Sequence, residues 1–245
     1  MSFEDEVSAR VEANASNTAL QSAAQQLMQT SIEAKYSYNF SWMGRPIIQY
    51  PQDIVAMHEL IWRTQPDLIV ETGIAHGGSL ILSASMLELN AACGGPAGAE
   101  VLGVDIEIRP HNRQAIEQHP MARRISMIEG SSTSPDVLRQ VAARAAGKRS
   151  VLVCLDSNHT HAHVLQELEG YAPLVSVGSY CVVFDTIVED LAPPLVPDRP
   201  WGPGDNPKTA VWKFLETHPE FEIDRSMDNK LMITVAPEGF LRRVR

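Results

Sequence analysis

The sequence lacks an apolar run long enough to cross a membrane, since no stretch approaches the roughly 18 consecutive apolar residues that a spanning helix needs. Its first ten residues, MSFEDEVSAR, are acidic and contain no basic region followed by an apolar segment, so they do not resemble a secretory signal. We therefore expect no membrane span and a cytoplasmic protein.

Cysteine is also scarce, with three residues at Cys93, Cys154 and Cys181. Their wide spacing contains no CxxC pair and no even framework, which excludes a small secreted domain held together by disulfides. Because Cys154 and Cys181 stand within apolar, strand-like runs, we expect both to be buried thiols.

Basic residues are in deficit: 20 Lys and Arg stand against 30 Asp and Glu, a formal net charge of −10 with neutral histidines. A protein that neutralises phosphates usually carries an excess of Lys and Arg, so this balance argues against a nucleic-acid partner. The 245 residues are 44% hydrophobic and 20% charged, an ordinary composition for a globular chain with a sizeable core. This length predicts one domain, or one domain with an extension.

From Asp67 onward, short runs rich in Val, Ile and Leu alternate with longer amphipathic segments, which is typical of βα units around a mostly parallel sheet. The runs VLVCLD and YCVVFD are apolar almost throughout, which indicates strands covered by helices on both faces. The predicted fold is α/β, with seven strands of which five are parallel and the last two form an antiparallel pair. The predicted strands are Leu68–Glu71, Val101–Ile106, Ile125–Glu129, Val151–Asp156, Tyr180–Asp185, Phe221–Asp224 and Leu231–Val235.

Helices are predicted between these strands and before the sheet. Asn206 is a strong candidate N-cap, because Pro207 after it suits the first helical position. Before the sheet we expect an N-terminal helix, an aromatic loop (YSYNFSWMGRPIIQYP) and a helix from about Asp53 to Thr64. We therefore divide the chain into a helical extension, residues 1–66, that packs on the core, and a domain of residues 67–245. The helices predicted within that domain are Ser79–Asn90, His111–Gln118, Asp136–Ala146, Ala162–Leu174 and one starting at Pro207, with loops at Ala91–Ala99 and Leu191–Gly204.

A glycine-bearing turn follows the first strand of the sheet, in the run VETGIAHGGS. Glycine at such a junction lets the chain turn sharply and lets a ligand approach the backbone. The dinucleotide pattern G-x-G-x-x-G is not met, because Ala75 stands at its second glycine position. The spacing E-x-G-x-x-x-G, from Glu71 through Gly73 to Gly77, better suits an adenosylmethionine-type ligand, which carries no phosphate.

Each part of this turn has a predicted contact with the cofactor. We expect Glu71 to take the ammonium group directly or through water, while the helix N-terminus at Gly78 and Ser79 meets the carboxylate. Gly73 and His76 complete the turn, although His76 has an equal alternative as an exposed turn residue.

The next two strand ends complete a predicted nucleoside pocket. Asp105 ends the second strand, where a carboxylate can accept both ribose hydroxyls. The third strand ends in Glu129–Ser132, and Ser131 there is expected at the adenine edge. A plain strand-to-helix turn is the simpler explanation of each piece alone, but three consecutive strand ends that share one crevice favour a nucleoside-bearing cofactor.

The fourth and fifth strands end in Asp156 and Asp185. Carboxylates at the tips of adjacent parallel strands repel one another unless a cation lies between them, and their oxygens are hard ligands suited to Mg²⁺. Both are therefore candidate metal ligands, and His159, three residues after Asp156, is a candidate general base. The alternative for Asp156 is a cap for the helix that follows.

Other polar and aromatic residues nearby have plainer predictions. His161 and His163 are expected to be solvent-facing residues at a helix start, because H-x-H without a third soft ligand is weak evidence for zinc. Glu189 and Asp190 are expected in a solvated acidic loop, and Trp201 is expected to pack rather than to bind substrate.

Four segments together resemble the cephalosporin hydroxylase family: WMGRPIIQYPQD (Trp42–Asp53), VETGIAHGGS (Val70–Ser79), LDSNHTHAHV (Leu155–Val164) and GPGDNP (Gly202–Pro207) with AVWKFL. The resemblance runs from about Tyr36 to the C-terminal PEGFLRR. Despite its name, that family implies the Rossmann-like fold of class I adenosylmethionine-dependent methyltransferases, with helices on both faces of the sheet. It also implies a similarity to the Mg²⁺-dependent sugar O-methyltransferases of macrolide biosynthesis.

The resemblance implies roles for three residues. Asp156 matches the first metal aspartate, His159 matches the base three positions later, and Asp185 matches the second member of an acidic pair. The first member of that pair is usually glutamate, whereas this sequence has Phe184, so one carboxylate ligand is missing. Either water, Thr186 or a substrate oxygen fills in, or metal binding is weak or absent.

These observations predict an adenosylmethionine-dependent O-methyltransferase that acts on a hydroxyl of a sugar or small polyol, in secondary-metabolite or surface-glycan biosynthesis. Mg²⁺ would orient the acceptor hydroxyl and lower its pKa, and His159 would accept its proton. Asp156 is assigned to catalysis, to metal binding and to the cofactor site.

Two other functions stay open. A nicotinamide-dependent oxidoreductase would use the same strand-end glycines and Asp105, although Ala75 and the lack of a Tyr-x-x-x-Lys pair count against it. A binding protein that kept a nucleoside pocket but lost catalysis is suggested by Phe184. Besides the small-molecule acceptor, we expect further copies of the chain as partners in a homo-oligomer, because the N-terminal helix and aromatic loop need a surface to cover.

Overall fold

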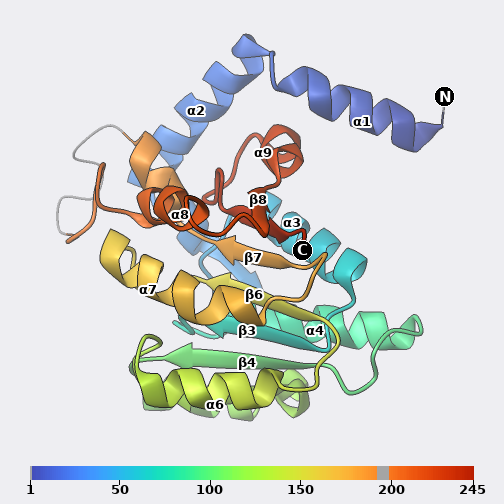
Figure 1. Ribbon diagram of the computed structural model, residues 1–245, viewed down its shortest axis with the longest axis vertical. Coiled ribbons are helices and arrows are strands. Elements are labelled where there is room, and N and C mark those ends of the chain that lie inside the picture. The colour runs from blue at the N-terminus through green and yellow to red at the C-terminus, as the bar shows by residue number, and fades with distance from the viewer. Residues whose placement is uncertain (1, 192–198) are drawn as a thin grey trace.

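Short apolar runs build a seven-stranded sheet with helices on both faces in the computed structural model, which describes residues 2–191 and 199–245 (Figure 1). The strand order is β5-β4-β3-β6-β7-β9-β8. The first five strands in this order run parallel, and β9 is antiparallel to both of its neighbours. The predicted fold class is therefore confirmed. The strands of this sheet are β3 (Leu68–Thr72), β4 (Glu100–Asp105), β5 (Ile125–Glu129), β6 (Val151–Leu155), β7 (Tyr180–Val183), β8 (Phe221–Ile223) and β9 (Phe240–Arg243).

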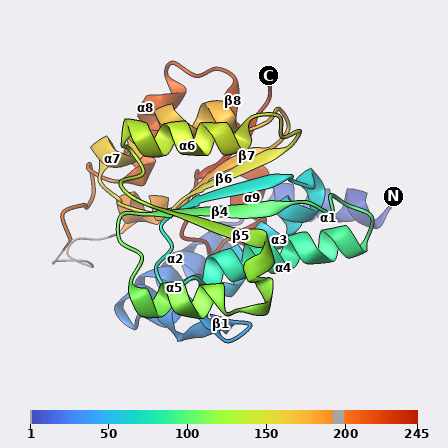
Figure 2. The same ribbon diagram turned by 90° about the horizontal axis from the view of Figure 1, so that it is seen from below.

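Successive side chains of each central strand point to opposite faces of the sheet and build two separate cores. Leu68 and Val70 of β3 pack in one cluster with residues of α6, α7 and α8, whereas Ile69 packs in the other with residues of α3 and α4. Figure 2 shows these two helical layers on either side of the sheet. The covering helices are α3 (Pro51–Thr64), α4 (Gly78–Ala92), α5 (Pro110–Glu117), α6 (Pro135–Ala145), α7 (His161–Tyr171) and α8 (Pro207–Leu215).

Most element predictions agree with the structure to within a few residues. Asn206 caps α8 as predicted: its side chain accepts hydrogen bonds from the amides of Lys208 and Thr209. Cys154 and Cys181 are buried free thiols, also as predicted, while Cys93 is exposed. No helix in the described residues is long and apolar enough to span a membrane. Part of the predicted loop Leu191–Gly204 lies outside the described residues.

The predicted strand Leu231–Val235 is wrong. Asp224 caps a short helix instead, α9 (Arg225–Leu231), which ends at Met232 with a positive φ of 57°. Val235 then donates its amide to the buried carboxylate of Asp53 on α3 at 3.1 Å. The apolar segment after α9 therefore contacts a distant helix instead of pairing as a strand. The last strand is β9, which the FLRR segment forms between β7 and β8.

The N-terminal region is more structured than the sequence indicated. The single predicted helix is two, α1 (Phe3–Asn14) and α2 (Thr18–Glu33), with Asn17 as the second N-cap. The aromatic loop contains a 3₁₀ turn, η1 (Tyr36–Asn39), and a small hairpin of β1 (Phe40–Trp42) and β2 (Arg45–Ile47). In Figure 1, α1 extends from the edge of the molecule, and its end contacts α9 through a hydrogen bond from Asn14 to the carbonyl of Asn229, 2.9 Å long.

The hairpin is fixed directly over the start of α4. Trp42 donates its indole N–H to the Ser85 hydroxyl at 3.0 Å. A Cβ at Gly78 would lie 2.1 Å from the Pro46 carbonyl oxygen, so the first residue of α4 must be glycine for β2 to dock. This docking brings residues 45–50 to the carboxyl-terminal edge of the sheet.

Candidate active site

The glycine turn between β3 and α4 is held in conformations that favour glycine. Gly73 has a φ of 90°, and a Cβ there would lie 2.0 Å from the backbone carbonyl oxygen of Asp156. Gly77 has a φ of 82°, and a Cβ there would meet the side chain of Ile116 at 2.4 Å. Ala75 adopts a positive φ of 46° without being glycine. The close contact at Gly73 ties the turn to the end of β6, where the acidic residues stand.

Two residues that the sequence did not single out brace this turn from outside. Arg45 of β2 donates to the His76 carbonyl from Nε at 3.0 Å and from Nη2 at 2.6 Å. Asn112 of α5 accepts from Arg45 at 3.0 Å and donates to the Ala75 carbonyl at 2.8 Å. Arg45 and Asn112 thereby satisfy the carbonyls of His76 and Ala75 from outside the turn, while the turn itself lines the cavity.

Glu71, the predicted partner of the cofactor ammonium, is buried near the end of β3 and accepts a hydrogen bond from the Ser79 hydroxyl. Burial raises the pKa of Glu71 to about 7, although the Ser79 hydrogen bond opposes the rise. Ser79 lines the cavity beside the turn, as do Gly73, His76 and Gly78. Glu71 stands one side chain behind that lining, so it faces the cavity through Ser79.

Asp105 and Ser131 occupy the predicted strand ends but have local partners. The Asp105 carboxylate accepts from the amides of Ile74 at 2.8 Å, Ala75 at 3.3 Å and Glu107 at 3.2 Å. The Ser131 hydroxyl lies 3.1 Å from that of Thr133. Neither residue lines the cavity at the ends of β3, β6 and β7. Ribose and adenine roles for Asp105 and Ser131 therefore stay predictions.

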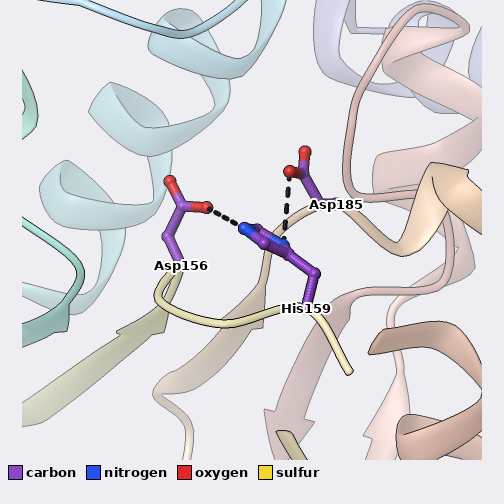
Figure 3. Close-up of side chains that lie close together, drawn as sticks. All are labelled: Asp156, His159 and Asp185. Carbon is purple, nitrogen blue, oxygen red and sulfur yellow. Dashed lines mark ion pairs between the residues drawn. The ribbon is translucent and has the colours of Figure 1, made fainter. Parts of the chain in front are cut away.

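The acidic corner comes together as the strand order predicts (Figure 3). Asp156 follows β6 and Asp185 follows β7, and the ring of His159 lies between their carboxylates. His159 Nδ1 is 3.3 Å from Asp185 Oδ2, and Nε2 is 4.0 Å from Asp156 Oδ1. One ligand atom from each residue lies within 4.8 Å of the others, a spacing that could hold a metal ion.

The electrostatics of this corner favour a cation. Burial raises the pKa of Asp156 well above its ordinary value, and the negative charges of Asp185 and Glu71 raise it further. Asp185 has a positive φ of 55°, an uncommon conformation for a residue other than glycine. The helix-cap alternative for Asp156 is wrong, because α7 begins at His161 and its N-cap is Thr160.

Phe184 and Thr186, on either side of Asp185, supply no further ligand. Phe184 is buried in the core cluster on the α3 and α4 face and also lines the cavity. Thr186 is fully buried, donates its hydroxyl to the Pro237 carbonyl at 2.7 Å and does not line the cavity, so it does not take the place of the missing carboxylate.

A loop before α8 covers one side of the acidic corner. The Trp201 ring lies against the His159 ring, with centroids 4.8 Å apart and planes inclined by 52°. Glu189 fixes this loop, because its carboxylate accepts from the Gly204 amide at 2.7 Å and from the Asn206 side chain. Asp190 pairs with the buried Lys208. The prediction of a solvated acidic loop is therefore wrong for Glu189, whereas Asp190 is exposed as predicted although it is paired.

The two histidines at the start of α7 are also more engaged than predicted. His161 bonds the Thr209 hydroxyl through Nδ1 at 2.8 Å. His163 Nε2 lies 3.1 Å from both the Ser132 and the Ser157 hydroxyls. They stand at a helix start, as expected, but both are half-buried, and they brace the loops around the cavity rather than face solvent.

One cavity of about 890 Å³ joins the glycine turn to the acidic corner. Gly73 and Ser79 line one side, Asp156, His159 and Asp185 another, and Gln49 with Tyr50 come from the segment between β2 and α3. That segment carries part of the family resemblance, but the sequence predicted no site role for Gln49 or Tyr50. The volume falls within the range of pockets that enclose small ligands.

Sheet order, glycine turn and strand-end acidic corner define the class: the chain has the class I methyltransferase fold. The sequence model of the family "Rhamnosyl O-methyltransferase/CmcI" matches residues 34–244. The protein belongs to this family, which confirms the predicted resemblance.

Curated relatives agree with this assignment. A rhamnosyl O-methyltransferase of Mycobacterium tuberculosis (strain ATCC 25618 / H37Rv) is 31% identical over 210 residues, which cover 83% of this chain and 78% of that protein. The rhamnosyl O-methyltransferase of Mycobacterium leprae (strain TN) is 30% identical over 209 residues, covering 83% and 82%. These relatives confirm the prediction of an O-methyltransferase.

Among solved structures, CmcI with Mg and adenosylmethionine superposes with a TM-score of 0.55 at 19% sequence identity, covering 85% of this chain and 78% of that one. CmcI with adenosylhomocysteine gives a TM-score of 0.54 at 16% identity, covering 83% and 81%. At these identities the similarity establishes the fold.

Proposed function

We propose that this enzyme transfers the methyl group of adenosylmethionine to a hydroxyl of a sugar, with His159 as the general base and with Mg²⁺ held at Asp156 and Asp185. The observation that carries the proposal is the cluster of Asp156, His159 and Asp185, which opens into the same cavity as the glycine turn. The named relatives support the sugar as acceptor class.

The glycine turn fits an amino-acid-bearing cofactor. Gly73, Gly78 and Ser79 line the cavity, and the amides at the start of α4 suit a carboxylate. Glu71 is a buried carboxylate with one hydrogen-bonded partner, Ser79, through which it can act on an ammonium group. We assign Asp105 and Ser131 to the ribose and adenine by their strand-end positions.

The acidic corner fits a divalent cation. Two carboxylates and an imidazole converge within ligand spacing. Burial and the neighbouring negative charges raise the pKa of Asp156, and a positive charge would relieve that repulsion. Oxygen ligands favour Mg²⁺, whose remaining positions would be filled by water or substrate oxygens. When bound there, the ion would lower the pKa of a coordinated acceptor hydroxyl.

His159 is placed to take the proton of the acceptor. Its Nδ1 lies 3.3 Å from the Asp185 carboxylate, which favours a proton on Nδ1 and leaves the lone pair on Nε2. Trp201 covers the ring on one side and limits its exposure to water. Nε2 is thus the atom that accepts the hydroxyl proton as the methyl group is transferred.

Methyl transfer from labelled adenosylmethionine to p-nitrophenyl α-L-rhamnopyranoside tests this proposal. We expect His159→Ala to lower kcat by roughly 100-fold or more while the affinity for adenosylhomocysteine, measured by calorimetry, stays unchanged. His58→Ala, at an exposed histidine of α3, is the matched control and should keep full activity. Equal turnover of the two variants would remove His159 from the mechanism.

The same assay separates the alternatives. Loss of activity in EDTA that Mg²⁺ restores supports the metal role of Asp185, and Asp185→Asn should then require more Mg²⁺. Tight binding of NAD without binding of adenosylhomocysteine would favour an oxidoreductase, whereas binding of adenosylhomocysteine without transfer to any acceptor would favour a binding protein.

We further propose that residues 1–66 form an acceptor-side extension of a methyltransferase domain, residues 67–245, and that α1 mediates self-association. Helix α1 has no buried residue, its Phe3 is 71% exposed, and its end contacts α9. So little packing is unusual for a short helix. Light scattering of the full chain should give a mass above one subunit, and Phe3→Ser should lower it.

The three free cysteines suit the cytoplasmic location predicted from the sequence.

A further inference from the structure

Gln49 has a buried polar atom without a partner at the wall of the catalytic cavity. The residue is 5% exposed, and its side-chain carbonyl Oε1 is buried without a hydrogen bond to any of the described residues. A buried acceptor without a donor is costly, so such atoms in folded proteins usually meet a partner, a water or a ligand. Gln49 lines the cavity, so a turn of its side-chain amide would present this oxygen to a ligand there.

The segment that carries Gln49 runs from the glycine turn to the side of the acidic corner. At its start, Pro46 and Ile47 press on Gly78 at the first turn of α4. At its end, Asp53 accepts from the Val235 amide at 3.1 Å, and the Val235 carbonyl accepts from the amide of Ile187, two residues after Asp185, also at 3.1 Å. Gln49 therefore lies on a segment that reaches from the predicted cofactor side of the cavity toward the predicted base. The acceptor must lie between those two.

The neighbours of Gln49 leave its carbonyl as a recognition group. The adjacent Tyr50 also lines the cavity, but its hydroxyl is already bonded to Ser31 at 2.7 Å. An amide carbonyl accepts hydrogen bonds and cannot donate them, so its ligand must offer a donor such as a hydroxyl. A sugar acceptor has several hydroxyls, of which the methylated one gives up its proton to His159.

We propose that Gln49 determines acceptor specificity by accepting a hydrogen bond from a second hydroxyl of the acceptor, one that is not methylated. The enzyme then selects polyhydroxylated acceptors over simple alcohols, because an acceptor without that hydroxyl leaves the buried carbonyl unpaired. This inference rests on the proposed function and adds the recognition of the hydroxyl pattern to it.

The test compares Gln49→Leu with the wild type on p-nitrophenyl α-L-rhamnopyranoside and on its 2-, 3- and 4-deoxy analogues. One analogue lacks the methylated hydroxyl and gives no product. On the parent glycoside we expect Gln49→Leu to lower kcat/KM by roughly 10- to 100-fold, the effect of one lost buried hydrogen bond. On one of the remaining analogues the variant and the wild type should be equal, because the partner hydroxyl is already gone.

Two variants keep the test informative. Gln52→Leu is the matched control, because Gln52 also has a buried carbonyl without a partner in the described residues but does not line the cavity; its kcat/KM should be unchanged. Gln49→Glu retains acceptor oxygens at the same reach and should recover most of the activity that Gln49→Leu loses. Adenosylhomocysteine affinity should be the same in all forms.

Several results would overturn the inference. If the wild type methylates the glycoside and Gln49→Leu behaves as Gln52→Leu does, Gln49 has no role in the acceptor site. If Gln49→Leu weakens adenosylhomocysteine binding and leaves the acceptor KM unchanged, Gln49 serves the cofactor instead. If losses in Gln49→Leu add to those of every deoxy analogue, no acceptor hydroxyl is its partner. A wild type that methylates none of the glycosides rejects the proposed acceptor class itself.

Discussion

Gly73 carries two separate constraints, and its replacement by alanine should reveal both. With a φ of 90°, an alanine would have to adopt a left-handed conformation, and its Cβ would lie 2.0 Å from the Asp156 carbonyl oxygen. The conformational strain costs about 1–2 kcal/mol. The forced contact adds roughly 1–3 kcal/mol, since the neighbour is backbone and must shift. The expected loss in the free energy of unfolding is therefore about 2–5 kcal/mol.

Gly147→Ala separates the two terms. Gly147 has a φ of 78° but an added Cβ would find nothing within 4 Å, so only the strain of about 1–2 kcal/mol applies. Urea unfolding followed by circular dichroism gives both free energies, and Tm should fall by about 2–4 °C for each kcal/mol in a chain of this size. Gly73→Ala should also lose methyl transfer, because the displaced backbone carries Asp156, whereas Gly147→Ala should keep it.

Equal unfolding free energies for the two variants would refute this reasoning. Such a result would mean that the ends of β3 and β6 separate freely, and that the glycine at position 73 is needed for its conformation alone. Full activity in Gly73→Ala would likewise contradict the tie between the glycine turn and the acidic corner.

Three other substitutions test the supports around the cavity. Arg45→Ala removes the bonds that hold the His76 carbonyl and should weaken adenosylhomocysteine binding in calorimetry, while Arg139→Ala, at an exposed surface pair, should not. Burial raises the pKa of Asp53 to about 7, so the folded state holds a proton that the unfolded chain releases from about pH 4. Stability from this group is thus lost as pH rises from about 4 to 7, and Asp53→Asn should flatten the slope of unfolding free energy against pH in that window, which an unchanged slope would contradict. Asn206→Ala should lower the free energy of unfolding by roughly 1–3 kcal/mol, because the buried side chain both caps α8 and bonds Glu189. Ser134→Ala, at the cap of α6, should lower it by only ~1 kcal/mol. Equal urea midpoints for the two variants would show that the buried bond to Glu189 adds no stability.

The parts of the fold that could be predicted are those with local causes. Continuous apolar runs marked β6 and β7 as strands covered on both faces, and the Asn206–Pro207 pair marked the start of α8. Because the two strands were predicted to be parallel neighbours, Asp156 and Asp185 could be predicted to lie next to one another. The prediction failed after Asp224, where a cap and a distant carboxylate, Asp53, decided the path of the chain.

The residues of the candidate site also differ in whether local sequence could predict them. His159 was predictable because it lies three residues from Asp156 on the loop of one strand. Arg45 and Gln49 were not, because each acts on residues about 30 or more positions away, and no spacing in the sequence announces such a contact. Their signal was present only as membership of the WMGRPIIQYPQD motif, which identifies a family without saying what each residue touches.

Gly78 shows why a motif can be predicted correctly and explained incompletely. The sequence predicts that the glycines of this turn let a cofactor approach the backbone. At Gly78, however, the atom closest to an added Cβ is the Pro46 carbonyl oxygen of the chain itself, at 2.1 Å. The same glycine-rich run therefore serves two surfaces: Gly73 lets the turn meet the end of β6, and Gly78 lets β2 dock on α4. Since that docking brings Gln49 to the cavity, a side chain at Gly78 should disturb acceptor recognition as well as cofactor binding. A motif that seems to belong to the cofactor thus also positions the residue that we assign to the acceptor.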